Sequence, residues 1–551
     1  MNTAPRPMHA TMMDVPLSTQ LIFAHGRRLH AGSRVANWRD GRFDATSFED
    51  VARRVESLAG ALAALGVRHN TRVATYCWNT RAHLECYLAV PSMGAVLHTL
   101  NVRLFPEQIL GIMNHAEDEV LVVDASLLPT LREVLPRVPT LRHVLVIGAA
   151  EAGADHFAPP QARVHDYEQL LGRQEGRFDW PALAERDAAV VCYTTGTTGA
   201  PKGVVYSHRT IYLHTLGTLG VDTFAISQAD RILLLPSMFH ANAWGLPYSA
   251  WMAGADLLMP GPDLKPASLR RMIERERPTF TAVVPTLIND LLQADRESPL
   301  DMTSFRVIVS GGSVVSPALI RAVRERWNVP VLQGWGMTET SPMCCLSIPP
   351  RGTPVADEPA WRTRSGRPVP GMFVRLVGDD GRPLPNDGRT VGELQLRGPW
   401  VTGAYHLQAS PESFTRDGWL RTGDVGTIDP QGYVQITDRS KDVIKSGGEW
   451  VSSVDLENQI AYHPGVFEAA VIGVPDPRWD ERPLAVVVRR PGEQVSAPEL
   501  RNFLQERVAR FWLPERWAFV DALPKTSVGK IDKKELRRQF GDGSIPVETV
   551  K

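Results

Sequence analysis

Hydrophobic residues up to about residue 370 form short apolar runs separated by helical patterns. Each run ends in small or polar residues; the runs are Ala188–Tyr193 and residues 232–235, 280–284, 307–309 and 329–332. Between them, Pro266–Glu276 and Pro317–Trp327 have the apolar spacing of helices. Strand–helix alternation predicts parallel sheets covered by helices, with ligands bound at the carboxyl ends of the strands.

After about residue 370 the apolar segments become short and closely spaced, which predicts antiparallel β structure. Past Asp438 the pattern predicts a compact α+β unit. We therefore expect an α/β protein with four parts. These are a tail over residues 1–19, a large domain over 20–437 with parallel-type sheets, helices and a small antiparallel β subdomain, a hinge over 438–442, and an α+β C-terminal domain over 443–551.

Charge and cysteine usage narrow the class of protein. The 551 residues include 60 basic and 61 acidic side chains, so the strongly basic surface of a sequence-independent nucleic-acid binder is missing. Five cysteines without CxxC spacing argue against a disulfide framework or a zinc site. Residues 1–14 lack the apolar region of a signal peptide. We expect a cytoplasmic protein with no nucleic-acid partner.

The longest uncharged stretch, residues 232–255, is long enough to span a bilayer. It is interrupted by Pro236, His240, Asn242 and Pro247, which do not suit a spanning helix. The stretch therefore predicts a buried strand, loop and helix, and we expect no integral membrane segment.

A glycine- and threonine-rich segment directly follows the run Ala188–Tyr193. It contains Thr194, Thr195, Gly196, Thr197, Thr198, Gly199 and Lys202. Glycines let backbone N–H groups approach an anion, the hydroxyls add neutral donors, and the lysine adds positive charge. The segment thus predicts a polyphosphate site, although Pro201 stands where a Walker loop requires glycine.

Three further segments carry candidate chemistry. Residues 333–340 follow another apolar run, and Trp335 could stack on an adenine while Glu339 offers a hard oxygen ligand for Mg²⁺. Asp424 could accept both hydroxyls of a ribose. Residues 524–532 predict an exposed turn that presents Lys530.

Lysine is rare in this chain, with nine among the 60 basic residues. Because lysine is a compact mobile point charge and arginine a rigid fork, each remaining lysine is of interest. Lys202, Lys441, Lys445 and Lys530 all fall in or beside these segments, and Lys525 flanks the last one. Their clustering marks the predicted path of the phosphates.

With these segments in this order, residues 20 to 540 resemble the adenylate-forming superfamily of acyl-CoA synthetases, peptide-synthetase adenylation domains and firefly luciferase. The runs 236–244 and 445–453 look most like those of bacterial medium- and long-chain fatty-acid–CoA ligases. The resemblance implies an ATP-dependent ligase with Mg²⁺ as cofactor. A carboxylic acid and ATP would give acyl-AMP and pyrophosphate, and coenzyme A would then give acyl-CoA and AMP.

The resemblance also implies roles for individual residues. Thr194, Glu339 and Lys530 would be catalytic, with Thr194 and Glu339 meeting Mg²⁺. Beyond the phosphate segment and its Lys202, the nucleotide would contact Gly312, Ser313, Gln333, Gly334, Trp335, Thr338, Asp424, Arg439, Lys441 and Lys445. Acyl and CoA contacts would come from His240, Asn242, Trp244, Gly447, Gly448 and Trp450. Many relatives have Tyr where this chain has Trp335, which should preserve stacking but alter the neighbouring pocket.

In this superfamily the C-terminal domain is expected to be mobile, delivering Lys530 for adenylation and withdrawing it afterwards. A homodimer through the N-terminal part is allowed by the resemblance alone. Alternative readings are a CoA ligase for aryl or short functionalised acids, including sulfur-containing propionates, and an acyl-AMP ligase that loads a carrier protein. Luciferase-type oxidation also stays open. A non-enzymatic relative would be expected to lack Lys530, Glu339 or the threonine segment, and this chain has all three.

Overall fold

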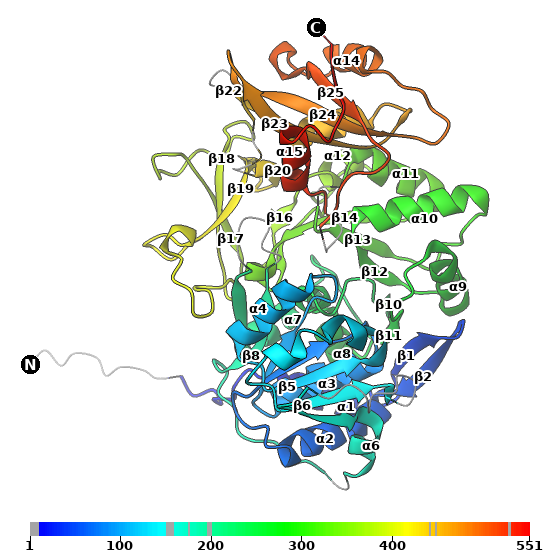
Figure 1. Ribbon diagram of the computed structural model, residues 1–551, viewed down its shortest axis with the longest axis vertical. Helices are drawn as coiled ribbons and strands as arrows, with labels where there is room; N and C mark the ends of the chain where they lie inside the picture. The colour runs from blue at the N-terminus through cyan, green and yellow to red at the C-terminus, as the bar shows by residue number, and fades with distance from the viewer. Residues whose placement is uncertain are drawn as a thin grey trace, which may run out of the picture.

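The computed structural model describes residues 10–149, 159–174, 177–194, 201–313, 315–439, 442, 444–446, 449–526 and 530–550, with Arg439, Lys445, Glu449 and Trp450 as backbone only. Two large sheets form the body of the protein (Figure 1). The seven-stranded sheet has the order β7-β6-β5-β3-β4-β8-β9, and the nine-stranded sheet has the order β16-β15-β14-β13-β12-β10-β11-β1-β2.

Both sheets are mainly parallel, as the alternating pattern predicts, and antiparallel strands lie at their edges. The seven-stranded sheet consists of β3 (Arg72–Tyr76), β4 (Val96–Thr99), β5 (Val120–Asp124), β6 (His143–Ile147), β7 (Arg163–Asp166), β8 (Ala188–Tyr193) and β9 (Gly203–Ser207). The nine-stranded sheet consists of β1 (Arg34–Arg39), β2 (Arg42–Ser47), β10 (Arg231–Leu233), β11 (Asp256–Met259), β12 (Phe280–Val283), β13 (Val307–Gly311), β14 (Val331–Gly336), β15 (Met343–Leu346) and β16 (Arg367–Pro368).

Helices cover both sheets. They are α1 (Thr19–Leu29), α2 (Phe48–Ala64), α3 (Arg81–Ser92), α4 (Pro106–Ala116), α6 (Tyr167–Gly172), α7 (His208–Leu219), α8 (Leu246–Ala253), α9 (Pro266–Glu276), α10 (Pro285–Glu297), α11 (Pro317–Trp327) and α12 (Glu358–Arg362). Three of them meet at Trp251 of α8, which is fully buried and stacks on Phe48 and Phe23 with ring centroids 4.2 and 6.1 Å away. This aromatic stack joins α8, on the nine-stranded sheet, to α1 and α2.

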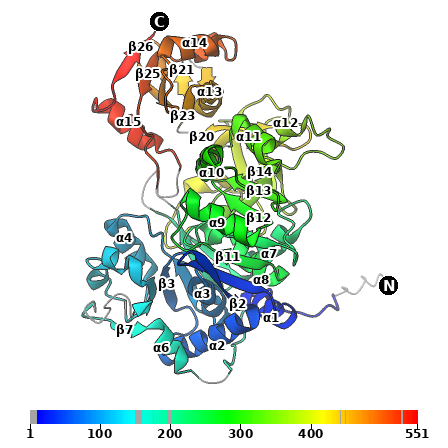
Figure 2. The ribbon, with the colours of Figure 1, turned by 90° about the vertical axis from the view of Figure 1, so that its right-hand side faces the viewer.

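The remaining sheets confirm the change of pattern near residue 370. A four-stranded antiparallel sheet comprises β17 (Phe373–Val377), β18 (Gly392–Arg397), β19 (Leu420–Ile428) and β20 (Val434–Arg439). The C-terminal domain follows, and Figure 2 shows it at one end of the molecule. Its elements are β21 (Ile444–Ser446), β22 (Glu449–Val451), α13 (Ser453–Ala461), β23 (Val466–Asp476), β24 (Asp480–Arg489), α14 (Ala497–Gln505), β25 (Arg516–Phe519), α15 (Lys533–Gly541) and β26 (Val547–Thr549).

The uncharged stretch folds as its composition predicts. It contains the end of β10, a loop with the short 3-10 segment Ala241–Gly245, and helix α8. Among the described residues, no helix is both long and apolar enough to cross a membrane.

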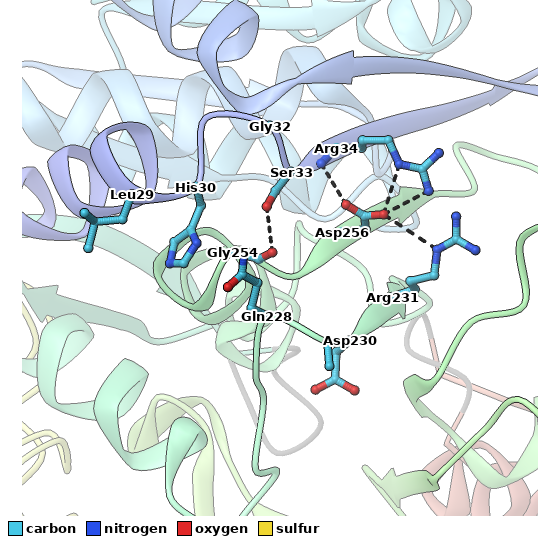
Figure 3. A pocket seen from close by; sticks show the side chains of 11 residues that line it. Leu29, His30, Gly32, Ser33, Arg34, Gln228, Asp230, Arg231, Gly254 and Asp256 are labelled. Carbon is cyan, nitrogen blue, oxygen red and sulfur yellow. Dashed lines mark hydrogen bonds and ion pairs between the residues drawn. The ribbon is translucent and has the colours of Figure 1, made fainter.

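A polar cavity of about 430 Å³ lies where α1 leads into β1 (Figure 3). Arg34, Arg231 and Asp256 begin β1, β10 and β11, so the cavity is at the amino ends of these parallel strands. Its charges pair with one another: Asp256 Oδ2 lies 2.9 Å from Arg34 Nη2 and 3.6 Å from Arg231 Nε. Ligands of such sheets bind at the carboxyl ends instead, and we interpret these ion pairs as structural.

Candidate active site

The predicted phosphate segment is closed at its base by backbone contacts. Thr194 N donates to Lys202 O at 3.0 Å, and Lys202 N donates to Thr194 Oγ1 at 3.1 Å. Below them, Tyr193 of β8 pairs with Gly203 of β9. The two ends of the segment, Thr194 and Lys202, are therefore held together. The predicted phosphate ligands Thr195, Gly196, Thr197, Thr198 and Gly199 lie outside the described residues.

Glu339 and Lys202 meet at Tyr405, a residue that sequence reasoning missed. The Tyr405 hydroxyl donates to Glu339 Oε1 at 2.8 Å, and Lys202 Nζ lies 4.6 Å from the centre of the Tyr405 ring. Burial and the Glu339 carboxylate raise the pKa of Tyr405, so the phenol remains a hydrogen-bond donor. Tyr405 is 66 positions from Glu339, and no spacing in the sequence points to it.

The predicted adenine and ribose residues are also linked. Trp335 Nε1 donates to Asp424 Oδ2 at 2.9 Å, and both side chains are buried. Asp424 lies opposite Arg439 across β19 and β20, so the strand register places the backbones of the two predicted ribose residues side by side. The sequence predicts a strand that ends before Gln333, but β14 continues through Gly336, because Gly334 and Trp335 pair with β15.

Hydrogen bonds from neighbouring backbone and side-chain groups also hold Gln333, Gly334 and Thr338 in place. Gln333 Oε1 accepts from Val315 N at 2.7 Å, and Thr338 O accepts from the Tyr206 hydroxyl at 2.6 Å. Gly334 pairs with Gly311 on the adjacent strand β13. Gly312 and Ser313 follow β13 and are exposed at its carboxyl end, where the parallel topology places ligands.

Lys530 reaches this carboxyl end from the C-terminal domain. Its Cε lies 3.8 Å from the position that a Cβ on Gly312 would occupy. Burial and the positive charge of Lys530 lower the pKa of His240 to about 4, so the imidazole is neutral near pH 7. Lys530 is therefore brought to the predicted phosphate and acyl residues of the large domain.

Not every predicted residue of the C-terminal part can be placed. Lys445 pairs through its backbone with Trp450 in the hairpin of β21 and β22. Lys441, Gly447 and Gly448 lie outside the described residues.

The predicted acyl residues form a strained loop. Ala241, Asn242, Ala243 and Trp244 have φ values of 42°, 54°, 48° and 59°, the left-handed region that residues other than glycine seldom adopt. Such strain is often found at binding sites. The loop is beside β13, since Trp244 Cη2 lies 3.3 Å from where a Cβ on Gly311 would stand.

A small cavity of about 10 Å³ lies beside Asn242. It is lined by Tyr206, Ile211, His214, Thr215, Asn242, Gly245, Tyr248 and Ser341. Most of these side chains are polar. This cavity is thus too small to hold an acyl chain as it stands.

The predicted metal ligands suit Mg²⁺ by their chemistry. Glu339 supplies a carboxylate, only 7% exposed, that has one oxygen bound by Tyr405, and Thr194 supplies a hydroxyl beside the loop. Hard oxygen donors of this kind, few in number and completed by phosphate oxygens, are typical of Mg²⁺ sites. Within the described part of the chain, no group of three or more His, Cys, Asp or Glu side chains could hold a metal by itself.

Comparison with known proteins shows the family to which this fold belongs. Residues 27–406 match the AMP-binding enzyme family, and residues 455–530 match the AMP-binding enzyme C-terminal domain. The chain is 41% identical to the 3-methylmercaptopropionyl-CoA ligase of Ruegeria pomeroyi, over 97% of this chain and 99% of that protein. It is 43% identical to the long-chain-fatty-acid–CoA ligase of Thermus thermophilus, over 96% and 97%.

A solved structure also resembles the whole chain. The anthranilate CoA ligase AuaEII in complex with anthranoyl-AMP superposes with a TM-score of 0.85 at 27% identity, covering 96% of this chain and 99% of that one. The chain therefore belongs to the AMP-binding enzyme family. Within that family it is an AMP-forming acyl-CoA synthetase, a CoA ligase that uses ATP and CoA as substrates.

Proposed function

We propose that the enzyme activates medium- and long-chain fatty acids, forming acyl-AMP and pyrophosphate and then acyl-CoA and AMP. The observation that carries this proposal is the uncharged segment 232–255, which folds beside β13 and close to Lys530. A second charge on the acid would have to be buried there without a partner of opposite charge, at a large energetic cost. The segment therefore suits a monocarboxylic acid with a hydrocarbon tail.

In the first half-reaction the acid's carboxylate approaches the α-phosphate of ATP, and both are anions. Catalysis then depends on positioning and on positive charge where negative charge builds up. Lys530, beside Gly312 and His240, would supply that charge. The neutral imidazole of His240 can contact the acid without adding a second cation.

The triphosphate would lie along the loop closed by Thr194 and Lys202. Mg²⁺ held by Glu339 and Thr194 would neutralise part of the phosphate charge when bound. Trp335 and Asp424, already hydrogen bonded to each other, would face the adenine and the ribose, with Arg439 opposite Asp424. The hydrogen bond fixes the orientation of both side chains before the nucleotide arrives.

For the second half-reaction, we propose that the C-terminal domain turns about residues 438–442. This rotation would withdraw Lys530 after acyl-AMP has formed and open a path for the thiol of coenzyme A. The hairpin of β21 and β22, which carries Gly447, Gly448 and Trp450, would then approach the acyl-adenylate.

The test is to measure AMP release and thioester formation with saturated acids from acetate to palmitate, with benzoates and with 3-(methylthio)propanoate, each with and without CoA. We expect acyl-CoA as the product and the highest kcat/KM for an unbranched acid of about eight or more carbons, because the uncharged segment suits a hydrocarbon tail. A maximum at acetate or at a benzoate would contradict the fatty-acid proposal. AMP release that is independent of CoA, with no thioester, would instead favour a carrier-protein thiol as acceptor.

A second candidate substrate is a short functionalised acid such as a thioether propionate. The cavity beside Asn242 has a volume of only about 10 Å³, which leaves little room for a long chain without rearrangement. The relative from Ruegeria pomeroyi is named as a 3-methylmercaptopropionyl-CoA ligase. A kcat/KM that is higher for 3-(methylthio)propanoate than for octanoate would favour the short functionalised acid over the fatty acid as substrate.

A further inference from the structure

A buried hydrogen-bond chain connects the C-terminal domain to the large domain where β20 ends. Lys533 Nζ donates to Ser453 Oγ at 2.5 Å, and it forms an ion pair with Glu457 Oε1 at 2.7 Å. Ser453 N and Oγ both donate to Asp438 Oδ2, at 2.7 and 2.5 Å. Figure 2 shows α13, which begins at Ser453, immediately beside β20, the strand that carries Asp438.

A second contact reinforces this connection. Arg537 Nη2 lies 2.7 Å from Asp442 Oδ1. Residues four apart share one face of a helix, so Lys533 and Arg537 both point from α15 to the junction between the domains. Helix α15 is therefore connected to the junction at two places, through Ser453 to Asp438 and directly to Asp442.

The contacts between α15 and the domain junction depend on a buried charge, the ammonium group of Lys533. Burial lowers the pKa of Lys533, but the carboxylates of Glu457, Asp438 and Asp442 outweigh burial and raise it overall, so the ammonium is charged. Asp438 is 2% exposed and Ser453 is fully buried. Because an unpaired buried charge is costly, these groups favour the one domain orientation in which all of them are paired.

This orientation also fixes Lys530. Helix α15 starts at Lys533, three positions after Lys530. The turn between them is held by Thr526 N donating to Lys530 O at 2.7 Å and by Lys530 N donating to Thr526 Oγ1 at 3.2 Å. A shift of α15 relative to β20 would therefore move Lys530 away from Gly312 and His240.

We propose that Lys533, Ser453 and Asp438 are positioning residues that hold Lys530 at the site of acyl-AMP formation. The inference rests on the proposed function, in which Lys530 serves the first half-reaction. It assigns these three residues to that step alone, because thioester formation does not require Lys530 at Gly312. The chain of contacts must then open when the C-terminal domain turns.

The test separates the two half-reactions in the full-length enzyme. Acyl-AMP formation is followed by pyrophosphate exchange, and thioester formation is followed with supplied acyl-AMP and CoA. Lys533→Met removes the charge, Ser453→Ala removes only the linking hydroxyl, and Lys534→Met is the matched control because Lys534 is exposed on the same helix. Thermal unfolding of each variant reports on folding.

We expect Lys533→Met to slow acyl-AMP formation by roughly 10- to 100-fold, since small displacements of a catalytic group have effects of this size. The rate of thioester formation in Lys533→Met should change by less than about threefold. Ser453→Ala should also slow acyl-AMP formation, but by a smaller factor than Lys533→Met does. Lys534→Met should alter neither step. Equal losses in both steps, or no loss of acyl-AMP formation in Lys533→Met and Ser453→Ala, would overturn the inference. Failure of the unsubstituted enzyme to form acyl-AMP with any acid would instead overturn the proposed function.

Discussion

At the scale of single residues, the site is defined by how two lysines are held. Lys202 lies over the Tyr405 ring, 3.8 Å from Glu412 Oε1 and 3.4 Å from Ser413 Oγ. Lys530 reaches Gly312 from the other domain. One cation therefore lies in the large domain at the end of the predicted phosphate segment, and the other depends on the placement of the C-terminal domain.

Lys530→Ala should lower the rate of acyl-AMP formation by about 100-fold or more, because a charge directed at the reacting phosphate is lost. Pyrophosphate exchange measures this step. Thioester formation from supplied acyl-AMP should persist. Lys534→Ala, which removes an exposed lysine of α15, is the control. Near-normal exchange in Lys530→Ala would show that the assigned role is wrong.

Tyr405→Phe removes the hydroxyl that binds Glu339 but keeps the ring beneath Lys202. Loss of a group that orients a metal ligand typically weakens metal affinity by about 10- to 100-fold. We expect a higher Mg²⁺ concentration for half-maximal pyrophosphate exchange, with activity recovered at excess Mg²⁺. Tyr433→Phe removes a hydroxyl bound to Ile348 O and is the control. An unchanged Mg²⁺ requirement in Tyr405→Phe would contradict this role.

At the scale of elements, the close approach of β13 and β14 lies beside the predicted acyl residues. A Cβ on Gly311 would stand 2.8 Å from Gly334 O and 3.3 Å from Trp244 Cη2. A side chain at this position must therefore displace either the neighbouring strand or the strained loop. The contact explains why a glycine ends β13.

Gly311→Ala should destabilise the protein by about 1–3 kcal/mol, the usual cost of overpacking. It should also raise the KM for the acid, because the loop carrying Trp244 is pushed from its position. Thermal unfolding and steady-state kinetics check both effects. Gly111→Ala in α4, where a Cβ would meet no atom within 4 Å, is the control. Wild-type stability and KM in Gly311→Ala would refute the close contact.

At the scale of the whole molecule, the large domain buries histidines in the neutral form. Burial lowers the pKa of His83 and of His208 to about 4, and that of His214 to about 3. Unfolded histidines titrate near pH 6.5. Between these values the unfolded chain binds more protons than the folded protein does, so acid favours unfolding.

The free energy of unfolding should therefore be constant above about pH 6.5 and decrease as the pH falls toward 4. Each such histidine contributes up to about 3 kcal/mol to the decrease. Chemical denaturation at several pH values measures it. His83→Gln, which can still bond Thr75 Oγ1 and Trp78 O, should make the slope shallower. A stability that does not change between pH 6.5 and 4.5 would contradict this expectation.

The sequence by itself determined the alternation of strands and helices, the change to antiparallel structure near residue 370, and the family. These depend on local patterns: apolar spacing selects strand or helix, and short segments such as the threonine loop carry their chemistry in adjacent residues. The bounds of Ala188–Tyr193, Pro266–Glu276 and Pro317–Trp327 agree with β8, α9 and α11 for this reason.

Only the tertiary structure decided which distant groups meet. Tyr405 binds Glu339 across 66 positions, Trp335 binds Asp424 across 89, and Lys533 binds Ser453 across 80. The extension of β14 into the adenine segment likewise depends on pairing with β15. Contacts of this kind arise from sheet register and domain packing, so a single sequence carries no local signal for them.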